Sequence, residues 1–259
     1  WTSLAASPMP SQLPWLENTD PFPDPSQAWG PDSPAPGLLA AGGNLDVPRL
    51  VHAYRQGIFP WFSAGQPVLW WSPTPRMVLK TNNFRLHRSL RKTIQKFRMQ
   101  PGCEIKVDHD FQAVISHCAE RKRKEQSGTW IVPSMVDVYN ALHKAGYAHS
   151  IETWMDGRLM GGLYCIGTGR AVFGESMFAL ATDASKIALA ALVCICLRQQ
   201  VSLIDCQQNT AHLASLGARE IERAIFLRHL CEACAKEPLQ WSFDPVYWDA
   251  LLPSSAPAA

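Results

Sequence analysis

The hydrophobic pattern between residues 148 and 205 places the tightest constraint on the fold. The apolar residues there recur with a period of two in three consecutive segments, which is typical of strands. We expect these strands at His149 to Trp154, Leu159 to Ile166 and Ala171 to Glu175, separated by Asp156-Gly157 and Gly167-Thr168-Gly169 turns. Short strands joined in this way predict a sheet at the centre of the fold.

A long apolar helix follows these strands. We expect Asp183 and Ser185 to cap it, and its apolar run from Ile187 to Leu197 ends at Arg198. That run is shorter than the roughly 18 to 20 residues of a membrane span, so we expect no membrane association. A strand from Val201 to Asp205 and a last amphipathic helix from Glu220 to Ala235 complete the pattern.

Helices are also expected before the sheet. They run from an Asp46 N-cap to Gly57, from Arg85 to Arg98, and from a Ser134 cap to Gly146. Helices and sheet together predict a mixed α+β or α/β fold. We divide the chain into a Pro-rich N-terminal extension (1–35), a small N-terminal domain (36–75), a catalytic domain (76–245) and a C-terminal tail (246–259).

The composition is typical of a globular protein of the cytoplasm. Of the 259 residues, 47% are hydrophobic and 18% are charged, which excludes global disorder. Residues 1–36 lack the basic start and apolar centre of a signal peptide, and eight cysteines in a chain this long favour free thiols. Cys231 and Cys234 have the spacing of half a zinc site, but no second pair of ligands follows, so we expect no metal.

The formal net charge of +2 conceals a strong asymmetry. Residues 76 to 124 hold 13 Lys and Arg against 4 Asp and Glu. Arg88, Lys92 and Lys96 are spaced by four and would share one helix face, and residues 121 to 124 (RKRK) form a second basic cluster. A solvated surface explains each cluster equally well, so charge alone leaves the partner open.

Three polar residues stand at the ends of predicted strands. Glu175 ends one strand, and Asp205 and Gln207 would project from the same face of another. Ligands bind at such strand ends in open sheets, although a carboxylate that neutralises a helix N-terminus gives the same pattern. Serine catalysis has little support, because Ser176 lacks the glycine spacing of a serine nucleophile. Cysteine catalysis has little support either, because Cys206 stands beside an acid that opposes thiolate formation. No phosphate-binding glycine loop opens a helix, so we expect no use of ATP or a dinucleotide.

Seven segments occur along the chain in the same order as in one family of bacterial enzymes. They are Pro36 to Leu45 (PGLLAAGGNL), Ala53 to Phe62 (AYRQGIFPWF), Trp70 to Arg76 (WWSPTPR), Gly128 to Trp130 (GTW), His149 to Glu152 (HSIE), Gly174 to Phe178 (GESMF) and Leu203 to Gln207 (LIDCQ). Over residues 36 to 230 the chain closely resembles leucyl/phenylalanyl-tRNA–protein transferases. The resemblance implies an acetyltransferase-like (GNAT-like) core with a small N-terminal domain.

The resemblance also implies an activity. Such enzymes transfer Leu or Phe, with Met as a further candidate, from aminoacyl-tRNA to the N-terminal Arg or Lys of a protein. The product carries a new peptide bond and is marked for degradation. Because an aminoacyl ester is already activated, we expect no cofactor. The expected partners are the charged tRNA and the acceptor protein, and we expect the enzyme to act as a monomer.

The site residues follow from the same resemblance. Asp205 and Gln207 would orient and polarise the attacking amine, and Glu175 would pair with the positive charge of the acceptor. The implied aminoacyl-adenosine site comprises Tyr54, Trp61, Trp130, Leu163, Val172, Phe173, Ile204 and Cys206. Leu163 stands where a familiar family pattern has Met, an apolar exchange of similar volume. The implied contacts to acceptor-stem phosphates come from Arg88, Arg91, Lys92 and Lys96.

Two other functions fit parts of the sequence. A coenzyme A-dependent acetyltransferase would share the fold, but it needs a pyrophosphate-binding glycine turn that opens a helix, whereas Gly167-Thr168-Gly169 leads into a strand. A non-catalytic tRNA-binding relative would share the basic surface, yet Glu175, Asp205 and Gln207 are all retained. Transfer from aminoacyl-tRNA is therefore the predicted function.

Overall fold

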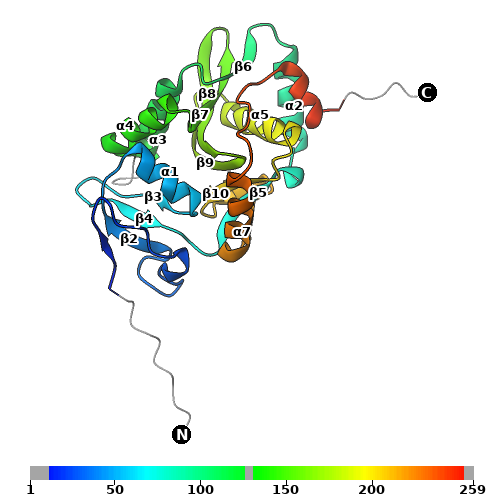
Figure 1. Cartoon of the computed structure of the whole chain (residues 1–259). Coiled ribbons are helices and arrows are strands. Elements are labelled where there is room, and N and C mark those ends of the chain that lie inside the picture. Colours follow the sequence, from blue (N-terminus) through cyan, green and yellow to red (C-terminus); the bar gives the residue numbers. More distant parts are fainter. Residues whose placement is uncertain (1–11, 126–130, 254–259) are drawn as a thin grey trace.

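The computed structural model describes residues 12–125 and 131–253, without the side chains of residues 122–125. Figure 1 shows a smaller sheet near the N-terminal end and a larger sheet with helices packed around it. The mixed α/β class that the sequence predicts is confirmed. The domain boundaries at residues 35, 75 and 245 remain predictions.

The smaller sheet has the strand order β1-β2-β4-β3. Its strands are β1 (Trp15–Leu16), β2 (Leu38–Gly42), β3 (Phe59–Pro60) and β4 (Leu69–Trp71). Helix α1 (Val47–Arg55) connects β2 to β3, and the Asp46 side chain caps it as predicted by accepting the Arg49 N–H at 2.9 Å. Trp70 is fully buried and its indole N–H donates to the Gly42 carbonyl, which joins the two central strands.

The larger sheet has seven strands in the order β11-β5-β10-β9-β8-β7-β6. They are β5 (Arg76–Lys80), β6 (Cys103–Val107), β7 (Ala148–Met155), β8 (Arg158–Thr168), β9 (Ala171–Ala179), β10 (Leu203–Gln207) and β11 (Arg219–Ile221). Strands β9 and β10 pair in parallel, whereas the other neighbours pair antiparallel. The parallel pair therefore marks a change of pattern in the middle of the sheet.

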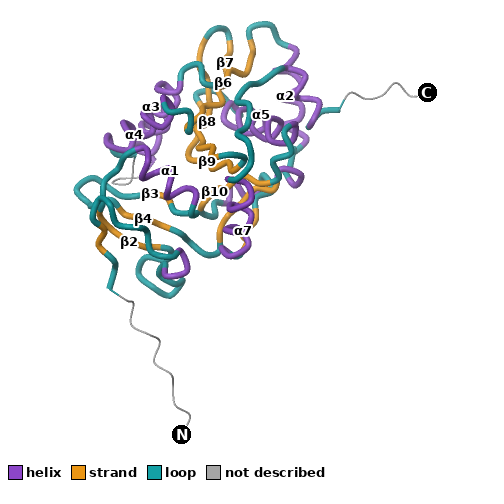
Figure 2. Tube along the Cα trace, in the orientation of Figure 1, coloured by secondary structure: helices purple, strands orange, loops and turns teal. Residues whose placement is uncertain are grey.

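Helices cover both faces of the larger sheet (Figure 2). One face packs against α2 (Arg88–Met99) and α5 (Ala184–Arg198), and the other against α3 (Phe111–Glu125) and α4 (Pro133–Lys144). Side chains of β8 alternate accordingly: Leu163 and Cys165 join the core that contains α5, whereas Tyr164 and Ile166 join the core that contains α3 and α4. Helix α7 (Arg223–Cys234) packs against α1 and β9.

Helix α5 is apolar on all sides because it is enclosed. Every residue from Ile187 to Cys196 is buried, with β7, β8 and β9 beneath and the 3₁₀ helix η3 (Pro245–Ala250) on top. The predicted long buried helix is thus confirmed. Of the helices in residues 12–125 and 131–253, none combines the length and apolar character needed to cross a bilayer.

The predicted caps of two helices differ in part from the structure. Asp183 stands at the N-cap position of α5 as predicted, but its φ is 63° and its side chain makes no capping hydrogen bond; its carboxylate lies 3.6 Å from the Lys186 Nζ. Helix α4 begins at Pro133, so Ser134 lies within its first turn. Proline suits that first position because it has no N–H to leave unpaired and its φ is already helical.

The strands also differ from the predicted ones. Strands β5, β6 and β11 were not predicted, because they are short and charged residues interrupt their apolar pattern. Strand β9 continues to Ala179, so Glu175 lies within the strand and not at its end. Strand β10 starts at Leu203 and ends at Gln207.

Glycine is required at the turn between β8 and β9. Gly169 has a φ of +56°, and a Cβ there would lie 2.7 Å from the carbonyl oxygens of Ala233, Cys234 and Lys236. Gly157 in the preceding hairpin also has a positive φ, but a Cβ there would meet nothing within 4 Å. We expect Gly169→Ala to lower the free energy of unfolding by at least about 2 kcal/mol, and Gly157→Ala by only about 1 kcal/mol. Urea unfolding of both variants checks this, and equal losses would contradict it.

Candidate active site

A cavity of about 530 Å³ opens between the two sheets. Its walls come from the β3–β4 hairpin, β8, β9, β10, α3, α4, α5 and the short helix α6 (Ala211–Ser215). Most of the lining is apolar, including Leu163, Leu189 and Ile204, and the indoles of Trp61 and Trp71 border it. This volume and lining are typical of a small-molecule site.

Two β-bulges shape the polar side of the cavity. In β9, Gly174 pairs with Cys165 and Ser176 pairs with Tyr164, so Glu175 is the extra residue. In β10, Asp205 pairs with Val78 and Gln207 pairs with Met77, so Cys206 is the extra residue. Bulges redirect side chains locally. Here they accompany the placement of Glu175, Cys206 and Gln207 on the cavity wall.

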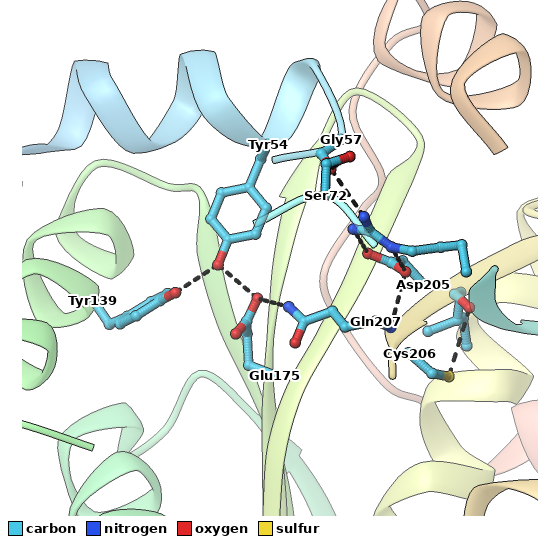
Figure 3. A network of polar contacts seen from close by, with 10 residues as sticks. Tyr54, Gly57, Ser72, Tyr139, Glu175, Asp205, Cys206 and Gln207 are labelled. Carbon is cyan, nitrogen blue, oxygen red and sulfur yellow. Dashed lines mark hydrogen bonds and ion pairs between the residues drawn. The ribbon is translucent and has the colours of Figure 1, made fainter. Parts of the chain in front are cut away.

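Glu175 is held by hydrogen bonds from both sides (Figure 3). The Gln207 Nε2 donates to its Oε1 at 2.9 Å, and the Tyr54 hydroxyl donates to the same oxygen at 2.6 Å. The Tyr139 hydroxyl lies 2.5 Å from that of Tyr54. Burial, reinforced by the negative charge of Glu175, raises the pKa of both tyrosines well above the ordinary value, so both hydroxyls stay protonated.

A buried ion pair stands behind Gln207. Arg76 and Asp205 are each 1% exposed, and two parallel hydrogen bonds join them: Nε to Oδ1 at 2.9 Å and Nη2 to Oδ2 at 2.7 Å. Arg76 also donates through Nη1 to the Gly57 carbonyl, and Asp205 Oδ1 accepts the Gln207 backbone N–H at 3.0 Å. The pair thus links the start of β5, the loop after α1 and the end of β10 (Figure 3).

The predicted arrangement of Asp205 and Gln207 needs a correction. Regular alternation would send both side chains to one face, but the bulge interrupts the strand and Gln207 has a φ of +64°. Gln207 therefore lines the cavity, whereas the Asp205 carboxylate faces Arg76 and does not line it. Asp205 is instead joined to Gln207 through the backbone N–H that its Oδ1 accepts.

The predicted aminoacyl-adenosine residues divide into three groups. Four line the cavity: Trp61, Leu163, Ile204 and Cys206. Three do not line it: Tyr54, Val172 and Phe173. Val172 is part of the core beside α5, and the rings of Tyr54 and Phe173 pack together with centroids 5.0 Å apart. Trp130 lies outside the described residues.

The predicted tRNA-binding residues lie on α2. Arg88, Lys92 and Lys96 are exposed, and their opposite face buries Leu90, Ile94 and Phe97. Arg91 is partly buried and donates to the Leu251 carbonyl at 3.4 Å, so it faces the C-terminal segment. None of the four lines the cavity.

Sequence reasoning missed two parts of the polar network, Arg76 and Tyr139. Arg76 closes the segment from Trp70 to Arg76, where an arginine next to a strand gives no local sign of burial. Tyr139 belongs to the apolar face of α4, so its pattern indicates only a core residue. Both acquire their partners from segments distant in sequence.

The comparisons with known proteins decide the family. Residues 43–74 match the family model described as "Leucyl/phenylalanyl-tRNA protein transferase N-terminal domain", and residues 78–231 match "Leucyl/phenylalanyl-tRNA protein transferase". A relative from Polaromonas sp. named leucyl/phenylalanyl-tRNA–protein transferase is 61% identical over 249 residues, 96% of this chain and 98% of its own length. The chain belongs to the leucyl/phenylalanyl-tRNA–protein transferase family.

Two further relatives carry the same name. The one from Albidiferax ferrireducens is 58% identical over 95% of this chain and 97% of its own length. The one from Leptothrix cholodnii is 56% identical over 92% of this chain and 95% of its own length. As a leucyl/phenylalanyl-tRNA–protein transferase by family, the chain is an aminoacyltransferase, which confirms the predicted family and enzyme class. The two alternative functions are not favoured.

The solved structures add no finer description of the fold. A crystallised C-terminal DUF2156 domain from Agrobacterium fabrum aligns with 78% of this chain and 64% of its own chain. Its TM-score is 0.36 and its sequence identity is 10%, which is too low to define the fold.

Cys206 lines the cavity but is a poor nucleophile. Burial, followed by the charge of Asp205, raises the pKa of its thiol to about 12. We expect about one molecule in ten thousand to carry the thiolate at pH 8, so iodoacetamide should leave Cys206 unmodified while it alkylates the exposed Cys231. Mass spectrometry of the digested protein checks this. Equal labelling of the two thiols would mean that Cys206 is accessible and activated.

Proposed function

We propose that this enzyme transfers leucine or phenylalanine from aminoacyl-tRNA to the N-terminal Arg or Lys of a protein. The hydrogen-bonded pair of Glu175 and Gln207 on the wall of an apolar cavity supports this function. We also propose that it acts in the cytoplasm, where its eight free cysteines stay reduced.

The donor would bind with its amino-acid side chain in the apolar part of the cavity. Leu163, Leu192 and Ile204 offer aliphatic contacts that suit a leucine or phenylalanine side chain and disfavour charged ones. Trp61 and Trp71 border the same cavity and offer faces on which the terminal adenine can stack. Such stacking is worth roughly 1 to 3 kcal/mol per base.

The acceptor would bind on the polar wall. Among the described residues that line the cavity, Glu175 is the only one with a carboxylate. Its negative charge suits the cationic N-terminal residue of the acceptor. The amide of Gln207 is not a base at neutral pH, so its role is to orient the α-amine. Glu175 is the group in this network that can accept the amine proton.

The reaction then needs no further reagent. The α-amine nitrogen attacks the ester carbonyl carbon, the new C–N bond forms, and the ester C–O bond breaks. The hydroxyl of the terminal ribose leaves with the proton that the amine gives up. The enzyme contributes chiefly by holding the two substrates in line.

Arg76 and Asp205 would act as positioning residues. Gln207 adopts a left-handed backbone conformation that costs about 1 kcal/mol or more outside glycine. The Asp205 carboxylate fixes it by accepting its N–H, and Arg76 fixes the carboxylate. The orientation of the Gln207 amide therefore depends on a pair that touches neither substrate.

We further propose that the larger sheet is the acetyltransferase-like core that the sequence resemblance implies. In support, β9 and β10 pair in parallel at two positions, Val172 with Ile204 and Phe173 with Asp205, and β9 then continues for six residues beyond. The cavity lies beside the point where this pairing stops, and Glu175 and Gln207 both line it. An acyl group bound there would lie next to the end of the parallel pairing.

The activity itself is tested with radiolabelled leucyl-tRNA and matched peptides. We expect the enzyme to label peptides that begin with Arg or Lys and to leave an otherwise identical peptide beginning with Ala unlabelled, because Glu175 pairs with the cationic end. Scintillation counting of the separated peptide measures this. No labelling of any peptide would overturn the proposed function, and equal labelling of all three would overturn the role of Glu175.

The positioning role is tested with Asp205→Asn. This change keeps the volume and an oxygen acceptor but removes the charge that holds Arg76. We expect kcat for leucine transfer to fall at least about tenfold, with KM for leucyl-tRNA changed by less than about twofold. Steady-state kinetics at saturating peptide measure both constants.

Asp108→Asn serves as the matched control for that variant. Asp108 also accepts a backbone N–H, that of Ser150 at 2.9 Å, and also pairs with a potential cation, His149, but it lies outside the cavity. We expect its turnover to match the wild type, and thermal melts of both variants report on folding. Unchanged turnover in Asp205→Asn would contradict the positioning role.

A further inference from the structure

The cavity and the basic face of α2 are separate, and no residue assigned so far contacts the part of a bound tRNA that would lie between them. An aminoacyl ester in the cavity would sit at one end of the tRNA, and the acceptor-stem phosphates would lie on α2, but none of Arg88, Arg91, Lys92 and Lys96 lines the cavity. The unpaired 3′ end of the tRNA must cross the surface between the two. That segment is single-stranded and carries its own phosphodiesters.

One arginine stands on the cavity wall. Among the described residues that line the cavity, Arg121 of α3 is the only Arg or Lys. Its Nη1 donates to the Met177 carbonyl of β9 at 3.2 Å. It also opens the second basic cluster of the sequence, residues 121 to 124, to which no predicted site residue belongs. Its position is therefore fixed at the edge of the aminoacyl site.

A histidine and a lysine lie near this edge. His212 of α6 lines the same cavity, and Lys186 follows Ser185, a lining residue at the start of α5. Burial, and then the positive charges of Lys186 and Arg121, lower the pKa of His212, so its ring is neutral at neutral pH and offers one N–H to an acceptor. Lys186 also contacts Asp183 at 3.6 Å and is 37% exposed. We name Arg121, Lys186 and His212 the rim cluster.

The rim cluster is connected to α2. Helix α6 carries His212 at its second position and ends at Ser215. The Ser215 carbonyl lies 2.8 Å from the Nε2 of His87, the residue immediately before α2. The first turn of α2, with Arg88, therefore adjoins the element that forms one side of the rim.

We propose that the rim cluster binds the phosphodiesters of the unpaired 3′ end of aminoacyl-tRNA between the cavity and α2. This inference rests on the proposed function and assigns a role to residues outside the predicted site. The fork of an arginine suits phosphate oxygens, and such contacts position a nucleic acid without reading its sequence. Arg121 would then hold the strand while the ester enters the cavity.

Three donors that differ in their phosphates test this proposal. They are leucyl-adenosine, which has no phosphodiester, leucyl-CCA trinucleotide, which has two, and leucyl-tRNA. We expect Arg121→Gln to lower kcat/KM for leucyl-CCA about tenfold relative to leucyl-adenosine, because one charge-assisted contact is lost. We expect Lys92→Gln to lower kcat/KM for leucyl-tRNA relative to leucyl-CCA, because α2 reaches only the stem.

The salt dependence provides a second measure. Each lost contact to a single-stranded phosphate should reduce the slope of log KM against log salt by about 0.7. We expect that reduction for leucyl-tRNA in Arg121→Gln. Arg158→Gln, an exposed arginine in the β7–β8 hairpin that does not line the cavity, is the matched control and should match the wild type with all donors.

Several outcomes would overturn the inference. An equal loss with leucyl-adenosine and leucyl-CCA would mean that Arg121 shapes the aminoacyl site and not a phosphate path. A raised KM for the acceptor peptide alone would mean that the rim binds the protein substrate. Arg121→Lys, which keeps the charge but not the fork, should retain part of the discrimination, and full loss with normal melting would argue against a phosphate contact. Failure of the wild type with every donor would instead overturn the proposed function.

Discussion

A buried ion pair between Arg76 and Asp205 holds the candidate site together. Removing two charges from water is costly, and it is tolerated here because bidentate geometry is joined by hydrogen bonds to the Gly57 carbonyl and from the Gln207 N–H. Loss of one partner would leave an unpaired charge in the core, which typically costs about 3 to 5 kcal/mol. The pair therefore fixes the loop that follows α1 and the end of β10 relative to one another.

The two β-bulges complete that framework. Each one adds a residue to a strand next to the cavity, Glu175 in β9 and Cys206 in β10, and the ladder that surrounds them is otherwise regular. Tyr54 and Tyr139 then hold Glu175 from behind, so the polar side of the cavity is assembled from four separate segments. A rigid polar wall beside an apolar cavity is what an enzyme needs when its substrate is already activated and only alignment is required.

Much of this could be predicted from the sequence, and the limits have physical reasons. The apolar run of α5 and the periods of β7 and β8 are local signals, and both were predicted correctly. Glu175 and Gln207 were recognised because polar residues in apolar strands are conspicuous. The bulges, the burial of Arg76 and the separation of Asp205 from the cavity were not predicted, because each depends on pairing with a strand distant in sequence.

We propose that the ion pair acts on catalysis through Gln207, and a double-mutant cycle on kcat measures this coupling. Leucine transfer to an Arg-initiated peptide is measured for the wild type, Arg76→Lys, Gln207→Ala and the double variant. We expect Arg76→Lys to lower kcat about tenfold in the wild type but less than about twofold when residue 207 is already Ala. Equal factors in both backgrounds would mean that the two residues act independently and that the ion pair has no effect through Gln207.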